Sequence, residues 1–155
     1  MAKKRTAFSL VELIIIVMWV GILAAIAVPR LNFAIISKQK ADTVARKIVT
    51  DLRLTRRLAI SDAANNTQGY ELQMANLPPY ASYEIVDRSP PPTTVDSLTI
   101  DSDVSVTCPA QSEFRFGPLG NLEPDSGTEI TVSAEGKTFT ITIVPATGTI
   151  KCVEN

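Results

Sequence analysis

Histidine is absent from this chain of 155 residues. Its absence excludes catalysis by Ser-His-Asp or Cys-His groups and every metal or haem site that needs a histidine ligand. Cysteine is scarce as well, since only Cys108 and Cys152 occur and their spacing is not that of a CxxC motif. The sequence also contains no nucleophile–base pair, phosphate-binding loop or cofactor motif. We therefore expect a protein that is not an enzyme and that uses no cofactor and no metal ion.

Charged residues make up only 20 % of the chain, and their two signs are segregated along it. Residues 31–60 carry seven Lys or Arg against two Asp, whereas residues 61–155 carry four Lys or Arg against thirteen acids. The formal net charge of −1 therefore hides a basic segment followed by an acidic one. Apolar residues account for 45 % of the chain, which is typical of a globular protein and excludes a wholly disordered one.

The N-terminal region contains the longest apolar run. A basic cluster, Lys3-Lys4-Arg5, precedes it, and no charged residue follows Glu12 until Arg30. A helix needs about 20 apolar residues to cross the hydrocarbon core of a membrane. The run predicts a helix that spans a membrane or packs into an apolar bundle, and the basic cluster predicts that its N-terminus stays cytoplasmic.

A cleavable secretory signal is the first alternative, because Ala25-Ile26-Ala27 fits a small-x-small cleavage site. A plain membrane anchor is the second. Glu12 argues against both, since an acid in such a run costs about 2.5–3.5 kcal/mol on insertion scales. The helical pattern also continues beyond Pro29 instead of giving way to a loop.

The stretch Lys3-Lys4-Arg5-Thr6-Ala7, followed by Phe8-Ser9-Leu10-Val11-Glu12, resembles the processing motif of the type IV pilin-like superfamily. That motif has a basic leader, a small residue, an aromatic residue and a Glu at the fifth mature position. The resemblance implies that prepilin peptidase cuts between Ala7 and Phe8 and that Phe8 becomes N-methylated. Ala7 departs from the family, which usually has Gly before the cut. Gly21 and Pro29 fall where the family often has Gly and Pro.

Glu12 has a physical role that follows from such processing. Cleavage leaves an α-ammonium on Phe8, and a buried carboxylate must find a partner or become neutral. In a staggered bundle, Glu12 of one subunit meets the Phe8 amine of the next and sets the axial register. The alternative is that Glu12 only reaches the lipid headgroups.

A second helical pattern follows from Leu31. We expect one long helix from Phe8 to about Ala64–Asn66, where Asn65-Asn66-Thr67-Gln68-Gly69 is a stop signal, with a kink at Pro29. Asn65-Asn66-Thr67 also fits the glycosylation sequon, but we interpret it as the helix stop. Apolar and small residues recur every three or four positions and predict the buried face. They are Ala41, Ala45, Ile48, Leu52, Thr55 and Ala59.

Beyond residue 68 the period changes from 3.6 to 2, and turn residues separate eight candidate strands. These are Tyr70–Met74, Ser82–Asp87, Ser97–Asp101, Val104–Thr107, Glu113–Phe116, Glu129–Ser133, Lys137–Val144 and Thr149–Val153. The expected fold class is α+β, a pilin fold in which a long N-terminal helix packs its amphipathic half on a C-terminal antiparallel β-sheet domain. The expected segments are a leader (1–7), a membrane-spanning assembly half of the helix (8–30), its amphipathic half (31–66) and a β-rich head (67–155).

Export would place Cys108 and Cys152 in an oxidising compartment, so we expect a disulfide between them, with two free thiols as the alternative. The bond would close a 45-residue loop and stabilise the head by about 4 kcal/mol. Asp101 and Asp103 are interpreted as a solvated loop and not as part of a calcium site, because no third acid and Gly turn accompany them.

Within the superfamily the head resembles H-type minor pseudopilins of type II secretion and related minor pilins. The resemblance rests on Phe114-Arg115-Phe116-Gly117 and on the closing Gly148-Thr149-Ile150. It implies a structural subunit of a type II secretion pseudopilus or type IV pilus, whose partners are prepilin peptidase, other pilin subunits and, before assembly, inner-membrane lipid. It also implies a bacterial inner-membrane protein with one membrane pass and a periplasmic head, later part of an extracytoplasmic filament. A major pilin and a DNA-binding minor pilin remain alternatives. The basic segment favours subunit packing over nucleic acid, because no aromatic residues interleave with it.

Overall fold

The computed structural model describes residues 9–27, 33–75 and 77–155. The chain divides into two compact units, Met1–Phe33 and Ala34–Asn155. Helix α1 runs from Leu10 to Ala27, and helix α2 runs from Phe33 to Ser61. Ala7, Phe8 and Pro29, the predicted cleavage, methylation and kink positions, lie outside the described residues.

Helix α1 begins with a capped turn. The Val11 amide donates a hydrogen bond to the Ser9 hydroxyl oxygen at 3.2 Å, and the Leu13 amide donates to the Ser9 carbonyl at 3.2 Å. Ser9 is therefore the N-cap, and Glu12 stands three residues later, where a capping box has its acid. An acid in the first turn is also favoured by the positive end of the helix dipole.

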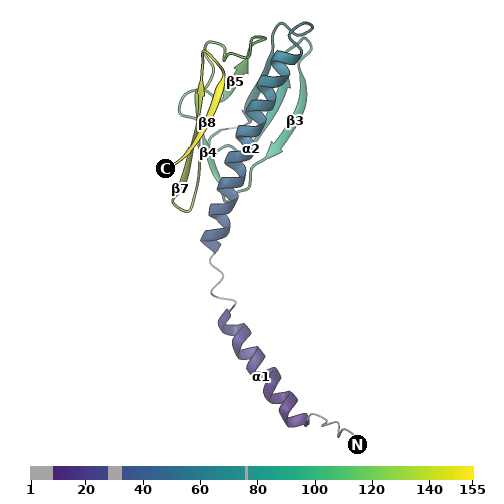
Figure 1. Cartoon of the computed structure of the whole chain (residues 1–155), viewed down its shortest axis with the longest axis vertical. Coiled ribbons are helices and arrows are strands. Elements are labelled where there is room, and N and C mark those ends of the chain that lie inside the picture. Colours follow the sequence, from purple (N-terminus) through teal and green to yellow (C-terminus); the bar gives the residue numbers. More distant parts are fainter. Residues whose placement is uncertain (1–8, 28–32, 76) are drawn as a thin grey trace, which may run out of the picture. The chain divides into compact units, whose positions relative to one another are not determined.

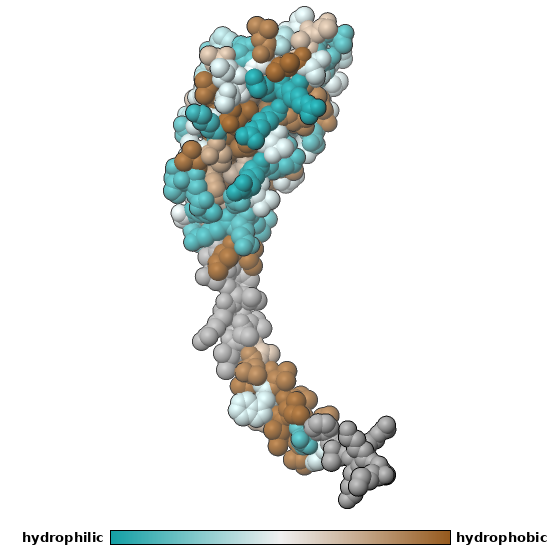
Figure 2. Space-filling model, viewed as in Figure 1, coloured by the Kyte–Doolittle hydropathy of each residue, from teal (hydrophilic) through white to brown (hydrophobic). Residues whose placement is uncertain are grey.

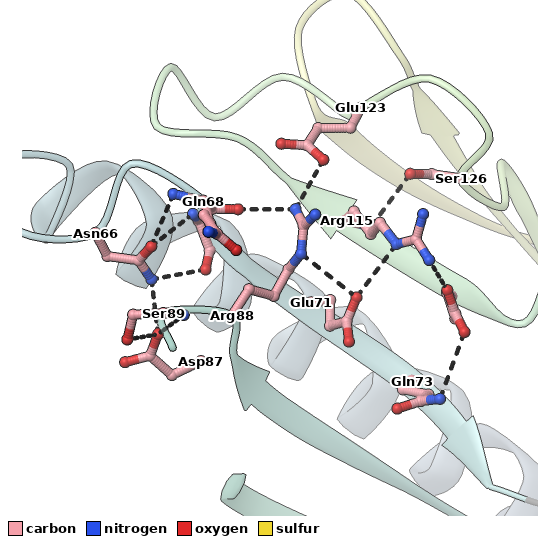
Figure 3. Close-up of polar contacts among 12 residues, drawn as sticks. Asn66, Gln68, Glu71, Gln73, Asp87, Arg88, Ser89, Arg115, Glu123 and Ser126 are labelled. Carbon is pink, nitrogen blue, oxygen red and sulfur yellow. Dashed lines mark hydrogen bonds and ion pairs between the residues drawn. The ribbon is translucent and has the colours of Figure 1, made fainter. Parts of the chain in front are cut away.

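Helix α2 buries the predicted face. Ala41, Ala45, Ile48, Leu52, Thr55 and Ala59 all have no exposed surface. The helix ends at Ser61, a few residues before the predicted stop, because the Asp62 carbonyl accepts hydrogen bonds from the amides of both Asn65 and Asn66 and so closes a turn. Asn66 is buried, and its side-chain oxygen accepts hydrogen bonds from the amides of Gln68 and Gly69 (Figure 3). The stop signal is thus a side-chain-bonded turn.

Two four-stranded antiparallel sheets follow α2. The first has the order β3-β2-β1-β5 and the second β4-β6-β7-β8 (Figure 1). The strands are β1 (Tyr70–Ala75), β2 (Ser82–Asp87), β3 (Thr93–Thr99), β4 (Ser105–Thr107), β5 (Glu113–Phe116), β6 (Glu129–Ala134), β7 (Lys137–Val144) and β8 (Thr149–Glu154). Seven of the predicted strands agree to within one residue at each end. The third is displaced, because β3 is an edge strand whose residues are nearly all exposed and so lack the alternation that marks a half-buried strand.

One apolar core joins α2 to both sheets. Its largest fully buried side chains include Tyr83 and Phe114 from the first sheet and Ile130 and Ile141 from the second, packed with Leu52 of α2. The burial of β1, β5 and β6 alternates residue by residue, as expected for strands with one face on a core. The C-terminal unit therefore has a core of its own, made without α1.

The predicted disulfide is wrong, because Cys108 and Cys152 are both free thiols. Cys108 directly follows β4 and Cys152 lies on β8, and these strands are the opposite edges of the second sheet. Three strand spacings of about 4.8 Å separate the edges by about 14 Å, whereas a disulfide needs Cα atoms within about 7 Å. Burial raises the pKa of the Cys108 thiol to about 12.

Candidate assembly surface

Helix α1 presents apolar side chains on all sides. Its large apolar residues from Leu10 to Leu23 are between 45 % and 75 % exposed, and Figure 2 shows this helix as a mostly apolar surface. A helix that is apolar all round is normally covered by other chains or by lipid. Within the unit Met1–Phe33 the described residues offer no such cover.

The prediction of a single-pass inner-membrane protein is wrong, because no helix among the described residues has the length and apolar character needed to cross a membrane. Helix α1 has 18 residues, which span about 27 Å at 1.5 Å per residue, and Glu12 occupies its first turn. The segment that the sequence predicts to span the membrane, residues 8–30, is longer than the helix that the structure describes.

Glu12 is exposed, like its apolar neighbours on α1. It lies in the first turn of the helix, which Ser9 caps. The sequence prediction for Glu12 concerned a contact with another subunit and not its position in a capped first turn. The spacing Ser9-x-x-Glu12 was a readable signal for it.

The basic residues of α2 fall into three groups: those with partners in the head, those paired with acids on α2 itself, and those that are exposed without an ion pair. Lys40 reaches Asp103 at 2.6 Å and Asp101 at 3.0 Å, and the Arg56 guanidinium donates to the Gly120 carbonyl at 2.9 Å. Two pairs lie within the helix, Arg46 with Asp42 at 2.9 Å and Lys47 with Asp51 at 2.7 Å. Lys38, Arg53 and Arg57 are exposed and make no ion pair with a described residue. The basic face that the sequence predicts is therefore reduced to a few exposed cations.

Asp101 and Asp103 both bind the ammonium of Lys40. Hydrogen bonds from Lys40 to both carboxylates raise the pKa of the lysine, and the backbone amide of Asp103 together with Lys40 lowers the pKa of Asp101. The described residues contain no group of three or more acids and cysteines placed to hold a metal ion. The ammonium of Lys40 joins α2 to the loop before β4.

Asp51 is the buried acid of the α2 interface, at 2 % exposure. The Tyr83 hydroxyl donates to one of its oxygens at 2.6 Å, and the Lys47 ammonium donates to the other at 2.7 Å. Both oxygens are satisfied, which is the condition for burying a carboxylate without a large penalty. The sequence gives no signal that Asp51 is buried and bonded in this way, because nothing near it shows that β2 brings a tyrosine to it.

A high-pH transition is expected from two tyrosines. Burial and a hydrogen bond to Asp62 raise the pKa of Tyr70 to about 12, and burial with the bond to Asp51 also raises the pKa of Tyr83. An unfolded tyrosine ionises near pH 10, so the folded state binds more protons above that pH. The raised pKa of Cys108 adds a smaller contribution that begins near pH 9. The free energy of unfolding should therefore be steady below about pH 8, begin to fall near pH 9 and fall most steeply from about pH 10 to 12. Chemical denaturation at a series of pH values measures this fall.

The matched variant for this transition is Tyr83→Phe. It removes one of the two titrating phenols, so the stability should fall less steeply with pH. At neutral pH it should cost about 1.5–3 kcal/mol, because one oxygen of the buried Asp51 loses its donor. An unchanged slope in Tyr83→Phe would show that Tyr83 does not titrate with unfolding.

Acidic residues in and beside the first sheet form ion pairs with two arginines of the same head. Arg88 reaches Glu123 at 2.7 Å and Glu71 at 3.7 Å, and Arg115 reaches Glu71 at 3.3 Å and pairs with Glu113 (Figure 3). The network spans β1, β5, the residue after β2 and the turn after β5. It fixes these strand ends, and its charges are largely compensated.

A groove runs between α2 and the edge of the second sheet. Its wall on α2 includes Arg46, Val49 and Arg53, and its wall on β7 and β8 includes Phe139, Cys152 and Glu154. Arg46 is held by Asp42, and Glu154 is held by Lys137 at 3.1 Å. Arg53 is thus the cation of the groove without an ion pair to a described residue.

Comparison with known proteins supports the fold. No family model and no curated protein matches the chain. Among solved structures, the chain resembles the minor pseudopilin EpsH from the type 2 secretion system of Vibrio cholerae, with a TM-score of 0.56 at 12 % identity. The match covers 74 % of this chain and 96 % of that chain. The predicted α+β pilin-like fold is confirmed.

Proposed function

We propose that this chain is a structural, non-catalytic subunit of an extracytoplasmic filament, a type II secretion pseudopilus or a related type IV pilus. The proposal rests above all on α1, an 18-residue helix whose apolar side chains are exposed within its own unit. The likeness of the chain's fold to that of a minor pseudopilin adds support. An exposed apolar helix joined to a separately folded head suits a subunit that is buried by copies of itself or by related subunits.

Assembly in this proposal is driven by burial of α1 against neighbouring helices. Each large apolar side chain that is fully buried stabilises the assembly by about 1.5–3 kcal/mol. One contact between Ile, Leu and Val side chains is much like another. These contacts therefore hold neighbouring subunits together without fixing the position of one subunit along the filament axis relative to the next. Glu12 is the residue that supplies the register, through the α-ammonium that processing creates on Phe8.

The test changes one apolar residue of α1. Ile15→Asp places an acid at the middle of the burial surface and should lower filament yield, or secretion of a pseudopilus substrate, at least about tenfold. Leu119→Asp is the matched control, because Leu119 is 88 % exposed on the head. If Ile15→Asp assembles as well as Leu119→Asp, α1 is not part of the assembly surface.

Processing at Ala7-Phe8 is a separate expected result. Protein made in a host that has prepilin peptidase should have the intact mass of a chain that starts at N-methylated Phe8. The motif around Glu12 motivates this prediction. Because Ala7 stands where the family usually has Gly, we expect the peptidase to cut this chain more slowly than a chain with Gly. A mature chain that begins at Val28 would instead support an ordinary secretory signal.

The alternative of a DNA-binding subunit has less support from the head. Lys40 and Arg56 have partners in the head, and Arg46 and Lys47 have partners on α2 itself. Three basic residues are left exposed and without an ion pair to a described residue: Lys38, Arg53 and Arg57. Duplex binding by the full chain with a steep salt dependence, abolished by Arg53→Glu with Arg57→Glu, would favour that alternative.

A further inference from the structure

Strand β8 is a long and uninterrupted sheet edge. It pairs with β7 in continuous register from Val144↔Thr149 to Phe139↔Glu154, and no other described strand pairs with it. The other three edges are limited, since β4 has three residues, β5 has four, and β3 has a register shift opposite Ile85 and Val86. Short or irregular edges protect a sheet from pairing with another chain. The described β8 is neither short nor irregular.

The backbone of β8 has a defined set of free groups. The Asn155 amide donates to the Thr138 carbonyl at 2.9 Å, which makes this pair a hydrogen-bonded one. Hydrogen-bonded and non-hydrogen-bonded pairs alternate in an antiparallel ladder. The amides and carbonyls of Ile150, Cys152 and Glu154 therefore point away from β7, toward the open edge.

The side chains of the same three residues face α2. They lie opposite Ile143, Ile141 and Phe139, which are buried under the helix. Strand β8 runs antiparallel to α2, because Gly148 lies against Arg56 while Glu154 shares the groove with Arg46. Arg53, one turn before Arg56, thus stands beside the Ile150 end of the open edge.

We propose that the β8 edges of two copies of this chain pair antiparallel about a twofold axis at Cys152. In this register Glu154 of the second copy lies opposite Ile150, next to the groove cation Arg53. The symmetry repeats the contact, so each copy contributes one arginine and one glutamate. The charges on the two sides of the pairing are therefore complementary.

Neighbouring registers are less favourable. Centring the pair on Lys151 places two like charges directly opposite each other, which destabilises a sheet. Centring it on Val153 moves Glu154 of the second copy away from Arg53 and leaves Ile150 unpaired. One pair of short strands is a small interface, so we expect a weak dimer whose population rises with concentration. This contact is separate from assembly through α1 and goes beyond the proposed function.

The test uses the full chain in detergent solution with Cys108→Ser, which leaves Cys152 as the single thiol. A short bismaleimide should link two copies through Cys152 into a covalent dimer. Arg53→Glu should lower the linking rate about tenfold, because two exposed ion pairs become two repulsions. Glu154→Arg should have the same effect, and the two changes together should restore the rate.

Arg57→Glu is the matched control, because Arg57 is exposed on the same helix outside the groove and should leave the rate unchanged. A backbone test pairs Cys152→Pro, which lacks the outward amide, with Cys152→Ser, which keeps it, and compares their concentration-dependent sedimentation. Only the serine variant should still dimerise. The proposal is overturned by absent linking, by equal rates for Arg53→Glu and Arg57→Glu, or by a charge swap that fails to restore the rate. Because α1 is the same in every variant, association through α1 would give all variants the same linking rate and cannot produce these differences.

Discussion

Glu12→Leu is expected to reduce filament assembly by more than about a hundredfold while α1 remains helical. The proposed register contact joins the Glu12 carboxylate to the α-ammonium of Phe8 in the next subunit. Removing the carboxylate leaves that ammonium buried without a partner, and an unpaired buried charge costs about 3–5 kcal/mol. Filament yield by electron microscopy, compared with the amount of extracted monomer, measures the effect.

Two further variants separate the register contact from the helix cap. Glu12→Gln keeps a side chain that completes a capping box but removes the charge. Ser9→Ala removes the cap hydrogen bond to the Val11 amide and should cost only about 1 kcal/mol. If the charge sets the register, the Gln variant should fail to assemble as the Leu variant does, and the Ala variant should assemble. Normal assembly by Glu12→Gln would show that the charge of Glu12 does not set the register.

Gly69→Ala is expected to destabilise the head by about 3 kcal/mol or more. Gly69 follows the Asn66 turn with a φ of +73°, a conformation that costs an L-residue about 1–2 kcal/mol. An added Cβ would also overlap the Phe116 carbonyl oxygen on the neighbouring strand β5. The turn and the β1–β5 pairing would both have to shift, so the change should appear in the denaturant midpoint of the full chain.

Gly136→Ala is the control for this prediction. Gly136 has a similar φ of +78°, but nothing lies within 4 Å of the Cβ that would be added. It should therefore cost only the conformational part, about 1–2 kcal/mol. An equal loss of stability in the two variants would mean that the contact with Phe116 is relieved by a small movement.

Local periodicity was enough to predict much of the head. The six residues of the α2 face are all buried, since a spacing of three or four residues places them on one side of a helix whatever it packs against. Strands such as Ser82–Asp87 and Glu113–Phe116 also match their predicted bounds, because alternation and flanking turn residues are properties of the local chain. The Asn66 turn was visible for the same reason.

Contacts between distant segments were decided only by the tertiary structure. The order β4-β6-β7-β8 separates Cys108 from Cys152, although export alone made a disulfide the default expectation. Lys40 pairs with Asp101 and Asp103, and Tyr83 reaches Asp51, because the strands that carry these partners fold back onto α2. The predicted bounds of β3 were displaced because an exposed edge strand needs no apolar alternation. The sequence by itself determined the elements and their buried faces, since these depend on residues a few positions apart. Which faces, edges and charges meet depends on strand order, and that order is settled by the packing of the whole head.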